Sequence, residues 1–161
     1  YSSGKIIQVG KATGLNLDPR MYVVPPLETF QKSEKVLDSA KKIGIKGKDL
    51  SSVTKEVDYL AKGKVADIYE AVAKNKPLGL GSTGRGTPNN LKEQAAMLVT
   101  KADPQQGKHL SGINMTDTRW PGSQGWQKWQ ATHKTSDGKT ITIHYVRNKN
   151  TDKVDDFKFV D

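Results

Sequence analysis

Four strand-like runs in the last third of the chain constrain its fold more than any other feature. They occupy residues 110–116, 124–133, 140–148 and 154–160, and alternation of polar and apolar side chains is clearest in the third. Turn-forming triplets separate the later runs: Ser136-Asp137-Gly138 and Asn150-Thr151-Asp152. Connections this short join neighbouring antiparallel strands, so the sequence predicts a four-stranded antiparallel meander.

A helix is predicted just before these runs. Thr87-Pro88 offers an N-cap followed by proline at the first helical position. Leu91, Ala95 and Leu98 then form an apolar stripe at helical spacing. The pattern predicts a helix from about residue 88 to 100, ended by Asp103-Pro104. One helix followed by an antiparallel sheet is an α+β fold.

The first half of the chain has a different pattern. Apolar residues at helical spacing predict short helices between residues 28 and 77, with breaks at Gly44 and Gly63. We therefore expect a small helical module over 1–77 and a second domain over 78–161. All His and Trp residues lie between 109 and 144, which places the expected site in the second domain. The chain begins with Tyr, which suggests a fragment of a longer protein.

Composition narrows the classes of function. The chain has 26 Lys and Arg against 17 Asp and Glu, and this net charge of +9 favours a polyanionic partner such as nucleic acid. It has no cysteine, which excludes disulfides, thiol catalysis and Cys-ligated zinc. Three isolated histidines without metal-ligand spacing argue against a metal site, and no cofactor is expected. No run is long and apolar enough to insert stably in a membrane.

The stretch GLGSTGRGTPNN, residues 79–90, contains the GxGxxG pattern of dinucleotide-binding loops. A dinucleotide loop must follow a buried strand and open a helix directly, and this one follows a helix and precedes the next helix by several residues. The sequence therefore argues against a nucleotide cofactor. The loop still suits an anion, and Thr83, Arg85 and Thr87 are expected to meet an RNA phosphate. The alternative is a flexible hinge between the two halves.

The run TITIHYVRN, residues 140–148, is the sharpest chemical feature. Alternation sends Ile143 and Tyr145 toward the core and Thr142 and His144 to the open face of the sheet. Pairing with the last strand would bring Lys158 and Asp156 beside His144, a set that suits metal-independent RNA cleavage. The alternative is a surface histidine with no task.

The run DTRWPGSQGWQKWQ, residues 117–130, interleaves aromatic rings with cations. Such a mixture suits stacking on unpaired bases and contact with phosphates. Because Trp residues are also common core anchors, at least one of the three must be buried. We expect Trp129 in the core, on the face opposite to Trp126 and Lys128.

The linked motifs MTDTRWPGSQGWQKW and ITIHYVRNKNTDKVDDFKF resemble the C-terminal toxin domains of contact-dependent growth inhibition proteins. The likeness is strongest to their tRNA-cleaving members, includes GSTGRGTPNNLKEQAAM, and covers about residues 79–161. It implies a metal-independent ribonuclease with a barnase-like or colicin-like helix and sheet. Such toxins are exported within a large cell-surface protein, act in the cytoplasm of a target bacterium and are neutralised by a cognate immunity protein. Upstream of the nuclease, family members carry an entry or translocation module, to which the helical module over 1–77 would correspond by position. Some relatives use elongation factor Tu, which makes it a candidate partner.

The resemblance also carries over residue by residue. The family histidine matches His144, its Arg-Trp pair matches Arg119 and Trp120, and its last strand matches Asp155, Asp156 and Lys158. Where the family often has DPRW, this chain has Asp117-Thr118-Arg119-Trp120, which lacks the proline. His109, beside Lys108, is a candidate second proton-transfer group.

The sequence thus predicts an antibacterial toxin that cleaves tRNA without a metal by 2′-hydroxyl attack, leaving a 2′,3′-cyclic phosphate. The alternative is a non-catalytic RNA- or protein-binding basic module, and a DNase ranks third. The residues expected to act in catalysis are His144, Arg119, Lys158, Thr142 and His109. Those expected to contact RNA are Thr83, Arg85, Thr87, Trp120, Lys128 and Arg147. Those expected to support the site are Asp117, Asp155 and Asp156.

Overall fold

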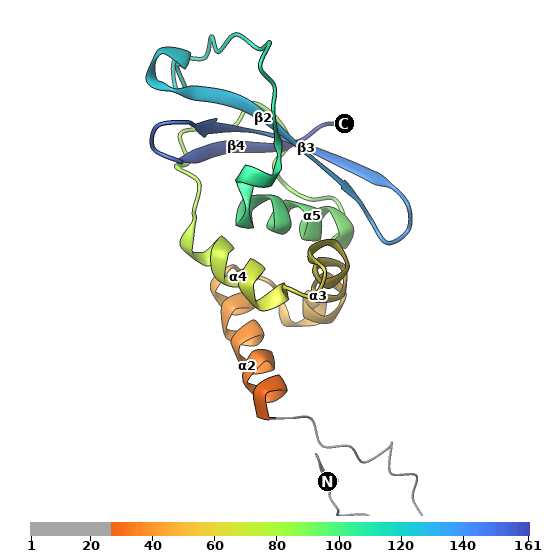
Figure 1. Cartoon of the computed structure of the whole chain (residues 1–161). Coiled ribbons are helices and arrows are strands. Elements are labelled where there is room, and N and C mark those ends of the chain that lie inside the picture. The colour runs from red at the N-terminus through yellow and green to blue at the C-terminus, as the bar shows by residue number, and fades with distance from the viewer. Residues whose placement is uncertain (1–26) are drawn as a thin grey trace, which may run out of the picture. The chain divides into compact units, whose positions relative to one another are not determined.

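The structure of the chain, a computed structural model, describes residues 27–161, with side chains described from residue 34 (Figure 1). The first 26 residues of the expected N-terminal module lie outside the described residues. The chain divides into two compact units, Tyr1–Asp38 and Ser39–Asp161, and helix α2 (Leu27–Lys42) spans the division. The second unit holds the other helices of residues 27–161 and the whole four-stranded sheet.

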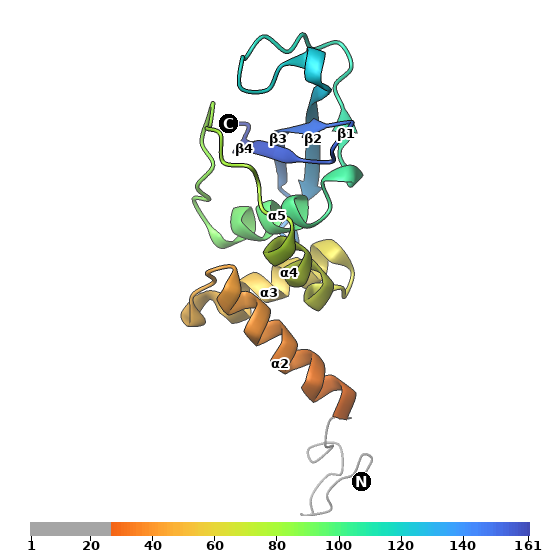
Figure 2. The same ribbon diagram turned by 90° about the vertical axis from the view of Figure 1, so that its left-hand side faces the viewer.

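Within the second unit, α3 (Gly47–Ala61) and α4 (Val65–Lys74) form the helical layer farther from the sheet (Figure 2). Val53 and Val57 on α3 and Tyr69 on α4 are fully buried, as their helical spacing predicts. The Tyr69 hydroxyl also lies 2.8 Å from the Thr54 hydroxyl, which ties the two helices together. Because both helices pack on α5, the compact unit begins well before residue 78, and the expected domain boundary does not coincide with it.

Helix α5 (Leu91–Ala102) lies between these helices and the sheet (Figure 2). Its N-cap is Asn90, whose side chain accepts a hydrogen bond from the Glu93 N–H at 2.8 Å, while Glu93 accepts one from the Asn89 N–H at 2.7 Å. The predicted cap at Thr87 is therefore wrong by three residues. Asn90 is favoured as the cap because Glu93, at the third helical position, accepts the N–H of Asn89, whereas the residue three positions after Thr87 is Asn90, which carries no carboxylate.

The sheet contains four antiparallel strands in the order β1-β2-β3-β4, so the predicted α+β fold and meander are confirmed. The bounds of β2 (Trp126–Lys134), β3 (Thr140–Asn148) and β4 (Val154–Phe159) agree with the prediction to within two residues. The predicted first strand is misplaced: β1 is only Lys108–His109. The chain turns away directly afterwards, where the Ile113 N–H bonds to the Leu110 carbonyl, and residues 110–125 form a loop with one short 3-10 turn, Gly122–Gln124.

Two apolar clusters stabilise the two faces of the sheet. The main core lies on the α5 face, and its buried members are Ala96, Met97, Ala131, Ile143, Tyr145, Val154, Phe157 and Phe159. Trp129 packs against this core while only half buried, as predicted for its face. On the other face, the 110–125 loop covers one end of the sheet, and Trp120, Trp126 and Val146 form a smaller core beneath it. The rest of that second face is open, and we refer to it as the open face.

Candidate active site on the open face of the sheet

Three neighbouring strands place one polar side chain each in a single row across the open face. Gln130 on β2 pairs with His144 on β3, and His144 pairs with Lys158 on β4. Lys128, two residues from Gln130 on β2, projects from the same face. We call these four residues, together with Thr83 and Asp156 described below, the open-face cluster. The prediction that β3 and β4 bring His144 and Lys158 together agrees with this register.

His144 is half buried and held in orientation by Gln130. Its Nε2 lies 2.8 Å from the Gln130 side-chain oxygen, so Nε2 carries the proton in this pairing and Nδ1 is left as the basic nitrogen. Burial lowers the pKa of His144 below its usual value, and the charges of Lys128 and Lys158 lower it further. His144 is therefore neutral near pH 7 and suited to accept a proton.

The two lysines of the cluster differ in their partners. The Lys158 ammonium lies 3.5 Å from the Asp156 carboxylate and also donates a hydrogen bond to the Thr83 hydroxyl. Lys128 forms no ion pair with any residue that the structure describes. Its burial, its contact with Lys158 and the Lys158 charge lower the pKa of Lys128 to about 8, although Asp156 opposes this change. Together they make a positively charged surface beside a neutral histidine.

A bulge in β4 turns two consecutive carboxylates toward one loop. The pairing of β3 with β4 shifts between His144 and Val146, and Asp156 adopts the left-handed backbone with φ of 53°. Consecutive residues of a regular strand point to opposite faces, so the bulge lets both Asp155 and Asp156 reach the glycine loop. Asp155 accepts hydrogen bonds from the N–H groups of Gly79 (2.8 Å) and Leu80 (2.9 Å).

Asp156 holds the next part of the same loop. It accepts hydrogen bonds from the Thr83 N–H and the Thr83 hydroxyl, both at 2.8 Å. Three backbone N–H groups of the glycine loop are thus bound by the protein's own carboxylates. Thr83 remains at the expected site, because its hydroxyl lies between Asp156 and Lys158.

Two of the three glycines of the GxGxxG pattern, Gly81 and Gly84, make room for cations in this structure. A Cβ atom at Gly81 would lie 2.0 Å from Nη1 of Arg119, and one at Gly84 would lie 3.0 Å from Cδ of Lys158. Gly79 and Gly81 also have positive φ, of 76° and 150°. The pattern therefore has a structural reason unrelated to a dinucleotide: it allows Arg119 and the stem of Lys158 to lie against the loop.

Arg119 lies at the border of the open-face cluster and is paired with Asp117. Its guanidinium donates to both Asp117 oxygens, at 3.0 and 2.8 Å. This pairing raises the pKa of Arg119 and lowers that of Asp117 to about 2, so both groups are charged at neutral pH. Arg119 is 39 % exposed and can still meet an anion.

Trp120 lies in the smaller core. It is 1 % exposed, its indole N–H donates to Asp155 at 3.0 Å, and the Arg119 guanidinium covers its ring. The ring expected to stack on RNA is therefore buried in this structure. Its sequence context, a Trp between a cation and a proline, gave no sign of this burial.

Arg85 and Thr87 lie away from the cluster. Arg85 donates to both Glu93 oxygens, at 2.9 and 3.0 Å, and is also paired with Asp161. Its Nη1 further donates to the Thr87 carbonyl at 2.7 Å. The guanidinium expected to bind RNA thus fixes the start of α5 and the C-terminal residue.

The two faces of the sheet separate the other predicted residues. His109 pairs with Trp129 and stacks on its ring at 5.8 Å, on the face opposite to His144. Arg147 lies over the same ring on the same face and pairs with Asp152. Thr142 projects from the open face, one step beyond His144, opposite Thr132. The structure therefore does not bring His109 or Arg147 to the open-face cluster.

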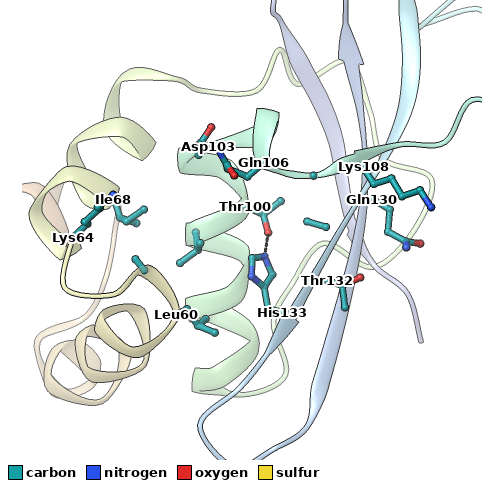
Figure 3. Close-up of a pocket in the computed structure, with 14 residues that line it drawn as sticks. Leu60, Lys64, Ile68, Thr100, Asp103, Gln106, Lys108, Gln130, Thr132 and His133 are labelled. Carbon is teal, nitrogen blue, oxygen red and sulfur yellow. Dashed lines mark hydrogen bonds between the residues drawn. The ribbon is translucent and has the colours of Figure 1, made fainter.

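His133 lines a separate cavity of about 620 Å³ between α3, α4, α5 and β2 (Figure 3). Its Nε2 lies 2.8 Å from the Thr100 hydroxyl, which donates to the Ala96 carbonyl. Burial lowers the pKa of His133. The three histidines thus occupy three different environments: His109 is exposed and stacks on Trp129, His133 lines the cavity, and His144 lies beside two lysines on the open face.

Gln130 is the site residue that sequence reasoning missed. The Ser136-Asp137-Gly138 turn fixes the β2–β3 register, which places Gln130 opposite His144. Counting outward from this turn would have found it.

Comparisons with known proteins give no further guide, because no protein-family model, curated protein or solved structure matches this chain. Among the described residues, no three His, Asp or Glu side chains come together to hold a metal ion. No helix in the described part of the chain has the length and apolar character needed to cross a membrane.

Proposed function

We propose that this chain is a metal-independent endoribonuclease that cleaves tRNA. One observation carries the proposal: a neutral histidine, oriented by an amide, lies beside two lysines on an otherwise open sheet face. Cleavage by 2′-hydroxyl attack needs a base near the ribose and cations near the phosphate. The open-face cluster offers both.

Each residue has a distinct task in this proposal. His144 removes the 2′-hydroxyl proton through Nδ1, while Gln130 holds the ring and its tautomer. Lys158, fixed by Asp156 and Thr83, stabilises the charge that develops on the phosphorus centre. Arg119 meets a neighbouring phosphate at the border of the cluster. The net charge of +9 adds a sequence-independent attraction to the phosphates of tRNA.

The resemblance of residues 79–161 to contact-dependent growth inhibition toxins supplies the biological part of the proposal. On this basis the chain is exported within a larger cell-surface protein and acts as a toxin in the target bacterium. An immunity protein neutralises it in the producer, and elongation factor Tu is a candidate partner during cleavage.

The test uses the full chain and total tRNA in EDTA, with and without elongation factor Tu and GTP. We expect cleavage products that end in a 2′,3′-cyclic phosphate, mapped by end analysis. His144→Ala should fold and lose about 10²- to 10⁴-fold in rate, the range expected for one proton-transfer group.

His109→Ala separates the two histidines, because His109 lies on the opposite face and should be replaceable with at most a few-fold loss. Tight, salt-sensitive tRNA binding without cleavage under every condition would contradict the proposal and indicate a non-catalytic RNA-binding module.

A further inference from the structure

The open-face cluster still needs a group that protonates the leaving oxygen. Of the two other histidines, His109 lies across the sheet on Trp129 and His133 lines a separate cavity. Each is therefore separated from His144 by the sheet or by the core. The proton donor must come from the open-face cluster itself if the reaction runs without a metal.

We propose that Lys128 is this general acid, which donates a proton to the departing 5′-oxygen while His144 acts as the base. The inference rests on the proposed ribonuclease function and goes beyond a role for Lys128 in RNA binding. In this proposal Lys128 donates a proton, whereas Lys158 stabilises the charge on the phosphorus centre.

The geometry distinguishes Lys128 from Lys158. Lys158 has a carboxylate at 3.5 Å and a hydroxyl partner, so its charge is fixed in place. Lys128 is half buried and has no ion pair among the described residues, so no carboxylate holds its proton. It projects from β2 diagonally across from His144, at the spacing of neighbouring side chains on one sheet face.

The charges around Lys128 favour release of its proton. The titratable groups that face it are His144 on β3 and Lys158 and Asp156 on β4, and the Arg119–Asp117 pair adjoins Lys158. Burial and Lys158 lower the pKa of Lys128 to about 8, so the protonated form still predominates at pH 7. The resting site therefore holds a neutral base and a charged acid, as the reaction requires.

The proposed step moves one proton to His144 and one proton from Lys128. His144 takes the proton from the ribose 2′-hydroxyl, O2′ forms a bond to phosphorus, and the bond from phosphorus to O5′ breaks. The Lys128 ammonium gives its proton to O5′. The products are a 2′,3′-cyclic phosphate and a 5′-hydroxyl, and the site returns to its resting state by exchange of one proton with water.

The test replaces the leaving oxygen with sulfur. A tRNA carrying one 5′-bridging phosphorothiolate at the bond mapped with the wild type releases a thiolate, which needs no proton. Lys128→Ala should lose about 10²- to 10³-fold on the ordinary bond and about tenfold or less on the sulfur bond. His144→Ala should lose activity on both. Lys134→Ala, on the same strand and face but outside the cluster, is the matched control and should change neither rate.

The pH profile gives a second readout that a purely structural lysine would not change. The wild type should show a bell-shaped kcat/KM with its alkaline limb near pH 8, and Lys128→Arg should fold, cleave slowly and lack that limb. Equal losses of Lys128→Ala on both substrates, or an alkaline limb that persists in Lys128→Arg, would overturn the assignment. A wild type that cleaves neither substrate would instead refute the proposed function.

Discussion

The cations on the helical side of the second unit and those on the open face have different partners. On the helical side, Lys92 lies 2.8 Å from the buried Glu56, and Arg85 is paired with both Glu93 and Asp161. On the open face, Asp155 and Asp156 accept most of their hydrogen bonds from backbone and indole N–H groups.

This difference shows why net charge alone does not locate the site. Carboxylates neutralise Lys92 and Arg85, whereas Lys128 has no carboxylate partner among the described residues and Lys158 shares the Asp156 carboxylate with Thr83 of the glycine loop. We therefore expect the role of each basic residue to depend on whether a carboxylate of the protein already binds it.

The largest effect should come from removing one charge on each side. Lys158→Met keeps the stem against Gly84 but removes the ammonium, so we expect tRNA cleavage to fall about 10²- to 10³-fold. Lys92→Met should leave kcat/KM within about threefold and lower the thermal unfolding midpoint instead, because Lys92 joins α5 to Glu56. Similar losses of activity in the two variants would show that the partners of a cation do not predict its role.

The next effect concerns the carboxylate that holds the loop. Asp155→Ala leaves two backbone N–H groups and the buried Trp120 indole without an acceptor, so we expect the free energy of unfolding to fall by about 3 kcal/mol. Asp152→Asn is the control, because Asp152 pairs with Arg147 at the surface and should change stability by less than about 1 kcal/mol. Urea unfolding measures both. A small effect of Asp155→Ala would mean that water replaces the carboxylate.

Local patterns predicted the fold well but only part of the site. Periodicity and turn residues located β2, β3 and β4. The turn triplets lie directly between these strands, and the alternation along β3 shows that Ile143 and Tyr145 are buried on one face. The alternation of β3 also placed His144 on the open face. The first strand failed because Leu110 and Ile113 belong to a loop that contacts the smaller core through Met115 and Trp120, while Ile113 stays exposed, and no local pattern encodes this.

The sequence could not predict which charged residues pair when they lie far apart in the chain. Nothing near Arg85 in the sequence shows that Asp161 is one of its partners, and nothing near Lys128 shows that it lacks an ion pair within residues 34–161. The bulge that turns Asp155 and Asp156 to one loop depends on the positive φ of Asp156, which is unusual for a residue other than glycine. These features follow from tertiary structure.

A third prediction uses the pH dependence of the helical side. Burial raises the pKa of Glu56, but hydrogen bonds from Lys92 and Ser136 outweigh it, so the pKa in the folded state is lowered. The stabilisation is therefore complete above the pKa of the unfolded chain, near 4.5, and is lost as pH falls through the folded value. Glu56→Gln should cost about 2 kcal/mol at pH 7 and progressively less in acid, as measured by urea unfolding from pH 7 to pH 3. A difference that is constant with pH would show that the charge of Glu56 is not responsible.

The smallest expected effect tests the glycine loop itself. Gly81→Ala adds a Cβ 2.0 Å from Nη1 of Arg119 at a backbone φ of 150°, so Arg119 must move and the backbone is strained. We expect a loss of about 1 kcal/mol in stability and a several-fold lower cleavage rate. Gly112→Ala is the control, because nothing lies within 4 Å of its added Cβ. If the Gly81 variant cleaved tRNA at the full rate, Arg119 would have no role at the border of the cluster, and the open-face lysines alone would account for phosphate recognition.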